Sequence, residues 1–539
     1  MRSRRLGLPI YFVVPLLVFA CDDNAPTYPA IVIYENTGDG TGLTGSGLTG
    51  GSLAGNGSSS GGSVNMTSGG TSSGGGTSSG GGTTNPLYAH CNNLWSGDDP
   101  PVQTQCNMDA LTDGGEISGD IAKDTTWKTG QSYRLKGPVR VLPGVTLTIQ
   151  PCVKVIGEAS DATLAVLAGD LGDPEQQCYY DSGKPGPGAK LIAVGEPMAP
   201  IVFTSSKPKG QRAPSDWGGV LLLGNAQNNL ALSDDGVSGT RVPIEGLAHP
   251  ECHGWHTDEF NAESSGELKY VRIEFASQQL SADNETNGLS LASLGSGTVL
   301  HYVEVSNSGD DCFEWFGGAI NADHLIALNC DDDMFDGDNG FSGKLQFLFG
   351  RQYQTTTETD SRGFEIDGAP FLTSTPLTTE QASNFTLCGG GPMDHNDSRD
   401  GAVVRSYASG VSLMNGMVTG FAGHGMFVSD PDSNAAKLTF MDMFDNASGV
   451  AADVDRQPGR NAVGLKQDWF LAQPGNSIAE PDRFCDCWAA LPVPVAATTG
   501  QGTKPVGFPD ETANYIGAFK DASADSNWMR GLWVDWSSN

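Results

Sequence analysis

The sequence predicts an all-β fold, a right-handed parallel β-helix in which short strands stack coil upon coil. Similar strands recur, as in Leu268–Ala276 and Leu300–Ser308, and a shorter strand such as Cys312–Trp315 follows each of them. The recurrence is about 22 residues and is lengthened where loops intrude. The strands alternate apolar and polar residues, and Gly, Asn and Asp separate them as turn residues. No long segment has the periodicity of an amphipathic helix. A β-helix coil needs about this length, and it buries its inner side chains only by stacking on neighbouring coils.

Changes in composition divide the chain into successive segments. Residues 37–85 are mostly Gly, Ser and Thr, so they have little to bury and should form a flexible linker with a reach of roughly 35–40 Å. We expect a signal peptide at 1–20, a lipid-anchor segment at 21–36, this linker at 37–85, a cysteine-containing N-terminal cap at 86–115, the parallel β-helix at 116–480 and a C-terminal cap at 481–539.

The first residues have the form of a secretory signal. Basic residues precede a short apolar run that ends at Ala20, and this run is too short to span a bilayer. Cys21 follows at once, and the arrangement resembles the lipobox of bacterial lipoproteins. The resemblance implies that Cys21 carries a diacylglycerol and an acylated amino terminus, and two or more chains give a lasting anchor. An ordinary signal peptide with an unrelated cysteine is the alternative.

The charge of the chain restricts its partners. Asp and Glu number 63 against 30 for Lys and Arg, which gives a formal net charge of -33. Nucleic acid and anionic lipid surfaces should therefore be repelled. The acidic composition is compatible with calcium, because hard cations bind several carboxylate and carbonyl oxygens. Solubility of an exported protein is the other explanation for the charge.

The cysteines agree with export. Of the 11, all except Cys21 are disulfide candidates, and an even remainder in an oxidising compartment favours disulfides. Neighbours in the sequence suggest the pairs Cys91–Cys106, Cys152–Cys178 and Cys312–Cys330. The remaining cysteines would pair among themselves; they are Cys252, Cys388, Cys485 and Cys487. A zinc site is the alternative, because Cys485–Cys487 and the stretch His249–His256, which contains Cys252, are both rich in metal ligands.

Several motifs along the chain resemble those of bacterial exported β-helix proteins, which are usually described as lipoproteins or surface proteins. They include Ser118–Ile121, Val139–Ile149, Pro200–Ser205, Asp216–Gly224 and Asn514–Phe519, in the family's order. The resemblance implies the fold and an exported location. It implies no reaction, because that family has no established common activity.

Acidic residues concentrate on two neighbouring coils. A period of about 22 residues stacks Asp311 on Asp333 and Glu314 on Asp336, and Glu365 continues the second row. Carboxylates about 4.8 Å apart repel one another unless a cation lies among them. We therefore predict calcium ligands here; turn capping without an ion and a catalytic carboxylate pair are the alternatives. The predicted ligands are Asp310, Asp311, Glu314, Asp331, Asp333, Asp336 and Asp338.

Evidence for catalysis in the sequence is weaker. Gly309–Cys312 resembles the paired-aspartate motif of polygalacturonase-type hydrolases, and Gly423–Gly425 resembles their histidine motif. The histidine motif lies far downstream in this chain, however, whereas in that family it lies about one coil from the aspartates. A calcium-dependent lyase would need a base near the ion, such as Arg351 or Arg362. We assign no catalytic residue.

These observations predict a lipid-anchored protein of the bacterial cell envelope, at the outer membrane or cell surface more than at the inner membrane. Its expected role is structural or ligand-binding, with calcium as the cofactor and a polysaccharide or a surface protein as the ligand. The membrane is a partner through the lipid, and nucleic acid is not. The alternative is a carbohydrate-active enzyme, either a calcium-dependent polysaccharide lyase or a polygalacturonase-like glycoside hydrolase.

Overall fold

A computed structural model describes a large part of the chain, and the first described residue is Cys106. Cys21, Cys91, Cys485, Cys487 and the segments before the β-helix lie outside the described residues, except for the last part of the predicted N-terminal cap. The described residues are 106–169, 178, 184–230, 241–247, 251–281, 284–352, 361–368, 375–390, 400–404, 410–428, 437–446, 451–453, 467–479, 501–520 and 526–536.

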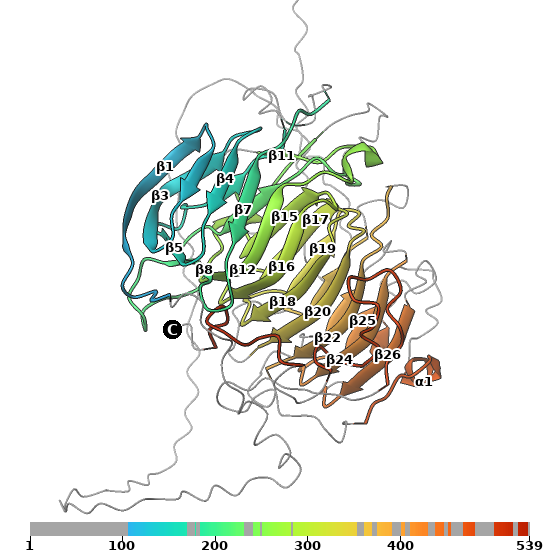
Figure 1. The fold of residues 1–539 in the computed structure, drawn as a ribbon. Coiled ribbons are helices and arrows are strands. Elements are labelled where there is room, and N and C mark those ends of the chain that lie inside the picture. The colour runs from blue at the N-terminus through green and yellow to red at the C-terminus, as the bar shows by residue number, and fades with distance from the viewer. Residues whose placement is uncertain are drawn as a thin grey trace, which may run out of the picture. The chain divides into compact units, whose positions relative to one another are not determined.

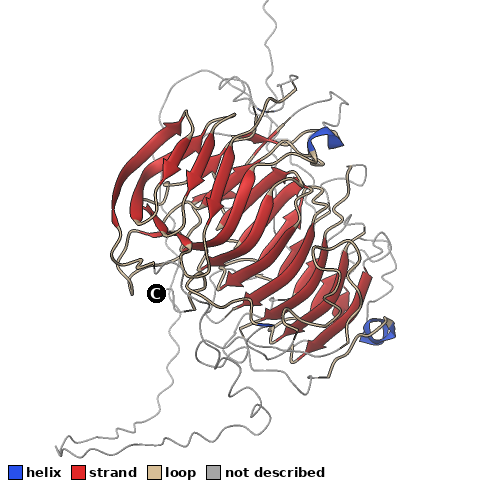
Figure 2. Ribbon diagram, in the orientation of Figure 1, coloured by secondary structure: helices blue, strands red, loops and turns tan. Residues whose placement is uncertain are grey.

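Parallel strands dominate the described residues, and they form three faces, named here sheets A, B and C (Figures 1 and 2). Sheet A begins with β2 (Thr125–Trp127), β4 (Thr146–Ile149) and β7 (Lys190–Val194). Sheet B begins with β1 (Thr112–Ile121), β3 (Gln131–Val141), β5 (Val153–Gly157) and β8 (Ile201–Ser205).

Longer strands then contribute to sheets A and B together, each with a bend between its two halves. They are β12 (Gly266–Glu274), β16 (Val299–Ser306), β18 (Ala322–Leu328), β20 (Lys344–Arg351), β22 (Gln381–Cys388), β24 (Ser412–Thr419) and β26 (Lys437–Phe444).

Sheet C begins with the C-terminal parts of β1 and β3, and it carries the acidic residues described below. Its further strands are β6 (Leu164–Val166), β9 (Val220–Leu223), β15 (Leu289–Leu294), β17 (Phe313–Gly318), β19 (Phe335–Asp338), β21 (Phe364–Ile366), β23 (Ala402–Val404), β25 (Met426–Val428) and β27 (Ala451–Asp453). The parallel β-helix predicted from the repeat is confirmed.

Short hairpins and helices accompany the coils in the described part of the chain. The hairpins are β10 (Val242–Pro243) with β11 (Cys252–His253), and β13 (Gln279–Ser281) with β14 (Asn284–Glu285). The helices are η3 (Asp258–Phe260) and α1 (Gln467–Ala472). Within the described ranges, no helix has the length and hydrophobicity needed to cross a bilayer.

The bend between sheets A and B is made by one residue per coil in the left-handed backbone region. Its φ lies between 50 and 58° in every long strand. This conformation turns the chain without breaking the register on either side, although it costs a non-glycine residue roughly 1–2 kcal/mol. We name this row the corner row; its members are Tyr270, Tyr302, His324, Phe347, Asn384, Asn415 and Phe440.

Aromatic rings on neighbouring coils stack in the corner row. The ring centroids of Tyr270 and Tyr302 are 4.6 Å apart, those of Tyr302 and His324 are 4.3 Å apart, and those of His324 and Phe347 are 4.6 Å apart. Aromatic contacts of this kind contribute about 0.5–1.5 kcal/mol each beyond their buried area, so they offset the backbone cost of the bend.

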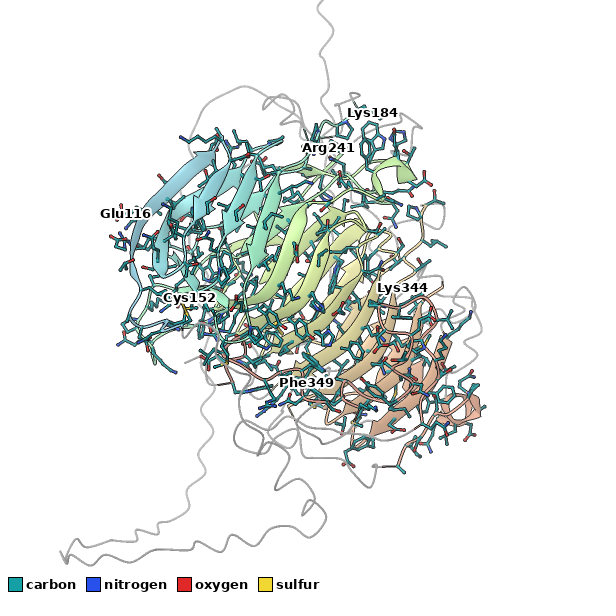
Figure 3. All side chains as sticks on the ribbon, viewed as in Figure 1. Glu116, Cys152, Lys184, Arg241, Lys344 and Phe349 are labelled. Atoms are coloured by element: carbon teal, nitrogen blue, oxygen red, sulfur yellow. A yellow bond between two sulfur atoms is a disulfide. The ribbon has the colours of Figure 1, made fainter. Side chains whose placement is uncertain are left out.

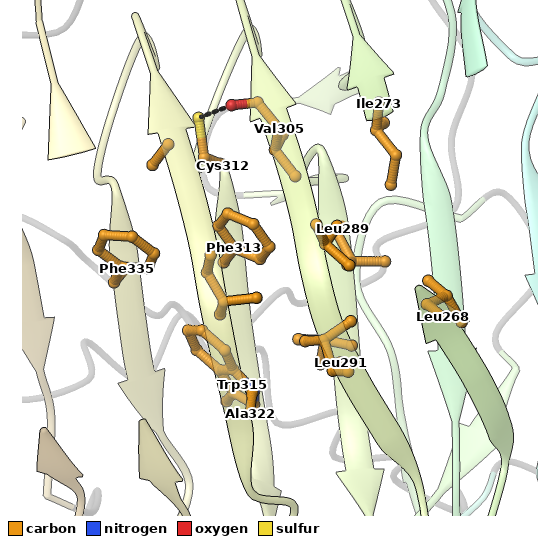
Figure 4. Packing of buried hydrophobic residues seen from close by; sticks show 14 of the residues in the cluster. Leu268, Ile273, Leu289, Leu291, Val305, Cys312, Phe313, Trp315, Ala322 and Phe335 are labelled. Atoms are coloured by element: carbon orange, nitrogen blue, oxygen red, sulfur yellow. Dashed lines mark hydrogen bonds between the residues drawn. The ribbon is translucent and has the colours of Figure 1, made fainter. Parts of the chain in front are cut away.

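The interior of the coils is filled by in-register apolar ladders. Phe313 lies 5.5 Å from Phe335, and Phe335 lies 5.5 Å from Phe364, measured between ring centroids. Leu289 and Leu291 of the preceding coil extend this packing (Figure 4). Since side chains alternate along a strand, burying these residues directs the intervening ones to the outside of sheet C.

Two of the three predicted disulfide pairs are wrong. Cys106 bonds to Cys152, which Figure 3 labels, and Cys178 bonds to Cys252 rather than to Cys152. In a solenoid, a cysteine meets residues of the next coil or of a covering loop, so nearness in sequence is a poor guide to pairing. The predicted Cys312–Cys330 bond is confirmed, and it joins two successive turns. Cys388 is also disulfide-bonded.

The C-terminal segment, expected as a cap at 481–539, lies along the side of the coils where it is described. Asn415 bonds to the backbone of Thr503, Asn384 donates to the carbonyl oxygen of Ala513, and Glu304 accepts from the backbone N–H of Asp535. The segment therefore runs back toward earlier coils, as its red trace shows in Figure 1.

Candidate functional site

The acidic row lies on the outer side of sheet C. The strand register places Glu314 of β17 beside Asp336 of β19, and Asp336 beside Glu365 of β21, as the repeat spacing predicts. Their neighbours Phe313 and Phe335 point into the core. One pleat further along β19, Asp338 points to the same side as Asp336.

The turn that leads into sheet C adds more acidic side chains. The backbone N–H of Asp333 donates to Oδ1 of Asp311 at 2.8 Å, which stacks these two turns as expected. Asp311 belongs to two groups of carboxylates, each with oxygen atoms within 4.8 Å of one another. One group adds Glu314 and Asp336, and the other adds Asp310 and Asp332.

Loops cover this acidic cluster, although it faces away from the interior of the coil. Asp311 is 6% exposed and Glu314 is 7% exposed. The side-chain N–H of Asn287, which follows the hairpin strand β14, donates to Oε2 of Glu314. Glu245, just after β10, and Glu285 of β14 add further negative charge from these loops. Asp336 and Asp338 are partly buried, so the loops cover most of the cluster and leave part of it accessible to solvent.

Burial and mutual repulsion both disfavour the ionised carboxylates. Burial first, and the charge of neighbouring carboxylates second, raises the pKa well above its ordinary value at six positions. They are Asp310, Asp311, Glu314, Asp333, Asp336 and Asp338. The guanidinium of Arg362 opposes this effect at Asp333 and offsets part of the rise in its pKa.

Among the described residues, Arg362 is a cation in contact with the cluster, and it is itself 4% exposed. Its Nη1 donates to Oε2 of Glu365 at 2.6 Å and lies 3.9 Å from Oδ2 of Asp333. One arginine cannot balance this many carboxylates. Oδ1 of Asp336 and Oδ1 of Asp338 are buried and have no hydrogen-bond partner among the described residues.

The donor set fits a calcium ion. Calcium takes six to eight oxygen ligands at about 2.3–2.6 Å, so two ligands on opposite sides of the ion are about 4.8 Å apart. Asp311, Glu314 and Asp336 meet that spacing, and a cation among them would satisfy the unpaired oxygen of Asp336. These three residues would hold the ion, with Asp338 next along the same face.

The other predicted ligands have different surroundings. Asp333 faces Arg362, whose backbone N–H also donates to its Oδ1. Asp331 belongs to neither group of converging oxygens, whereas its neighbour Asp332 does. The sequence shows three acidic residues in this turn, Asp331 to Asp333, without showing which side chains the backbone directs toward the other carboxylates. Asn287 and Glu245 were also missed, because they come from loops outside the repeat.

The histidine of the hydrolase-like motif does not reach the acidic cluster. His424 lies in the same row of turns as Asp311, and its backbone carbonyl accepts from Gly401 as that of Asp333 accepts from Cys312. Four coils separate the two positions, which amounts to about 19 Å at the spacing of stacked strands. His424 instead lies beside Asp400, with 3.2 Å between Nδ1 and Oδ1.

Comparison with known proteins places these coils in a family. The model of the pectate-lyase-like beta helix domain matches residues 119–457. No curated protein matches. The solved structure of pectate lyase Pel9A aligns with 78% of this chain and 100% of that chain, at 14% identity and a TM-score of 0.29. Similarity this low carries no argument about function.

Proposed function

The chain belongs to the pectate-lyase-like β-helix domain family, and from that premise we propose that it is a lipid-anchored, calcium-binding protein of the bacterial cell envelope. Its β-helix would present a rigid surface that binds a polysaccharide or a surface protein. The family supports a role connected with polysaccharide, and the lipobox-like sequence ending at Cys21 supports the anchor. Calcium would be held by Asp311, Glu314 and Asp336, and its charge would offset the repulsion among them.

The covering of the acidic cluster is the observation that carries this proposal. A lyase must bring a polymer to the ion and to a base, and both need an open groove. Glu314 and Asp311 are nearly fully buried, and Arg362 is already paired with Glu365. These contacts favour an ion that ties neighbouring coils together over one that binds a substrate.

A calcium-dependent polysaccharide lyase is the second candidate. The observation that favours it is the placement of Arg362 against the same carboxylates, because an arginine beside calcium can act as the base that removes a proton next to a uronate carboxyl group. A polygalacturonase-like reaction has less support, since His424 is coils away from the paired aspartates.

Calcium binding and lyase activity can be measured on the same preparation of the full chain. We expect calorimetry to find calcium binding that is lost in Asp311→Asn with Asp336→Asn, and we expect no unsaturated uronate ends to be released from pectate with calcium present. Calcium-dependent cleavage that is lost in Arg362→Gln would replace our proposal with the lyase. If calorimetry finds no calcium binding, calcium is not a cofactor in either proposed function.

The anchor is tested separately. Metabolic labelling with a fatty acid should label the wild-type chain and leave Cys21→Ser unlabelled. Label retained in the variant would show that Cys21 is not the lipidated residue.

A further inference from the structure

A second group of metal-ligand side chains lies at the corner between sheets A and B. His301 of β16 and Asp323 of β18 are register partners on neighbouring coils. His324 follows Asp323 directly and belongs to the corner row, with a φ of 57°. None of these residues contributes to the acidic cluster on sheet C.

The donor atoms of these three side chains converge. Nδ1 of His301 and Nδ1 of His324 both contact the same carboxylate oxygen, Oδ1 of Asp323. One ligand atom from each residue lies within 4.8 Å of the other two. Two imidazole nitrogens and one carboxylate oxygen are thus close enough together to bind one metal ion.

The scaffold fixes these side chains in place. Strand pairing sets the position of His301 against Asp323, and the left-handed backbone at His324 turns its ring onto the corner row. That ring lies between Tyr302, 4.3 Å away, and Phe347, 4.6 Å away, while the ring of Tyr302 meets His301 at 4.2 Å. Ligands held by packing lose little conformational entropy when an ion binds.

The site is sheltered but accessible. The side chain of His301 is 27% exposed, that of Asp323 is 17% exposed and that of His324 is 15% exposed. Imidazole nitrogen favours zinc, copper and nickel over calcium, which takes oxygen ligands. The chemistry of this group therefore differs from that of the all-oxygen cluster on sheet C.

We propose that His301, Asp323 and His324 form a binding site for a divalent transition-metal ion such as Zn²⁺. The ion takes the place of the hydrogen bonds between the two Nδ1 atoms and Asp323, and each neutral imidazole then carries its single ring proton on Nε2 instead of Nδ1. Water completes the coordination shell, as in sites with three protein ligands. The bound ion joins the coils of β16 and β18 beneath the C-terminal segment, whose Trp528 ring lies 5.0 Å from that of His324.

The test is equilibrium dialysis of the full chain against Zn²⁺ in the presence of excess Ca²⁺, which occupies oxygen-only sites. We expect one Zn²⁺ per chain, and a dissociation constant that rises at least about tenfold in His301→Ala and in Asp323→Asn. His301 is the most exposed of the three and lies outside the corner row, so its replacement should leave the fold intact. His424→Ala is the matched control, because it removes a histidine paired with a single aspartate, and it should leave binding unchanged.

Co²⁺ gives a second readout that does not depend on stability. The wild-type chain should develop the absorption bands of cobalt with nitrogen ligands, and His301→Ala should lose them. Absence of stoichiometric Zn²⁺, binding unchanged in His301→Ala, or binding abolished by Asp311→Asn would overturn the proposal. In the first two cases, the three residues form only a hydrogen-bonded group, and in the third the ion binds on sheet C.

Discussion

The acidic cluster on sheet C and the corner row between sheets A and B are both in-register ladders on the same coils, yet stacking has opposite consequences in the two. In the corner row, stacking brings the rings of Tyr302 and His324 to 4.3 Å and stabilises neighbouring coils. On sheet C, it brings Glu314 against Asp336, and burial first and the charges of neighbouring carboxylates second raise the pKa of both groups. In a parallel β-helix, side chains of the same kind stack on neighbouring coils. Stacked carboxylates repel one another and need a counter-ion, whereas stacked rings attract one another and need none.

The largest effect is expected from removing a ring of the corner row. Tyr302→Ala loses stacking on Tyr270 and His324 and an edge contact with Trp533, and should lower the free energy of unfolding by about 3 kcal/mol. Tyr302→Gly loses the same contacts but tolerates the φ of 56°, so it should be more stable than the alanine variant by about 1 kcal/mol. Urea denaturation of both variants measures the difference. Equal stabilities would show that the bend is not strained.

A smaller effect is expected for Glu380, a buried carboxyl group that stands alone. Its side-chain oxygens have no hydrogen-bond partner among the described residues, and burial raises its pKa to about 8. The folded state therefore holds a proton that the unfolded state releases, so stability should be full below about pH 4 and fall as the pH rises toward 8. Glu380→Gln should be more stable than the wild type by about 2 kcal/mol at pH 6 and equally stable at pH 4. A pH-independent difference would mean that Glu380 does not titrate on unfolding.

The smallest change in stability is expected for a row of amide side chains that hydrogen-bond to one another on successive coils, Asn307, Asn329 and Gln352. Asn329 donates to Oδ1 of Asn307 at 2.9 Å and accepts from Gln352 at 3.3 Å on the next coil. Asn329→Gly keeps the left-handed backbone, with its φ of 58°, and removes both hydrogen bonds, so it should cost about 1 kcal/mol. Thermal unfolding beside the wild type measures this cost. An unchanged midpoint would mean that solvent replaces the ladder without loss.

The sequence predicts what depends on the coil period and misses what depends on loops and bends. Alternation and spacing were enough for the fold and for the stacking of Glu314, Asp336 and Glu365, because strand register carries the period into space. They could not show Asn287 over Glu314, since a covering loop has no period. The left-handed bend at Tyr302 was missed because aromatic residues rarely adopt it, whereas the stacking of His301 on Asp323 is contained in their spacing of one coil.

Two of the predicted disulfide pairs are wrong for the same reason, whereas the third is correct. Cys312 and Cys330 lie in successive turns, so neighbours in sequence are also neighbours in space. Cys178 and Cys252 are 74 residues apart, so their pairing does not follow from nearness in sequence. Such contacts are set by loop paths, on which local sequence has little influence.

The most direct test of the calcium proposal is the melting temperature of the full chain in chelator and in millimolar calcium. Calcium at about a hundred times its dissociation constant should add about 2.7 kcal/mol to the stability of the folded state, which raises the midpoint by a few degrees. Asp311→Asn with Asp336→Asn should abolish this response, while Asp442→Asn, which removes a buried aspartate of β26 outside the cluster, should preserve it. The same midpoint in chelator and calcium for the wild-type chain would contradict the proposal and leave the acidic cluster as turn chemistry alone.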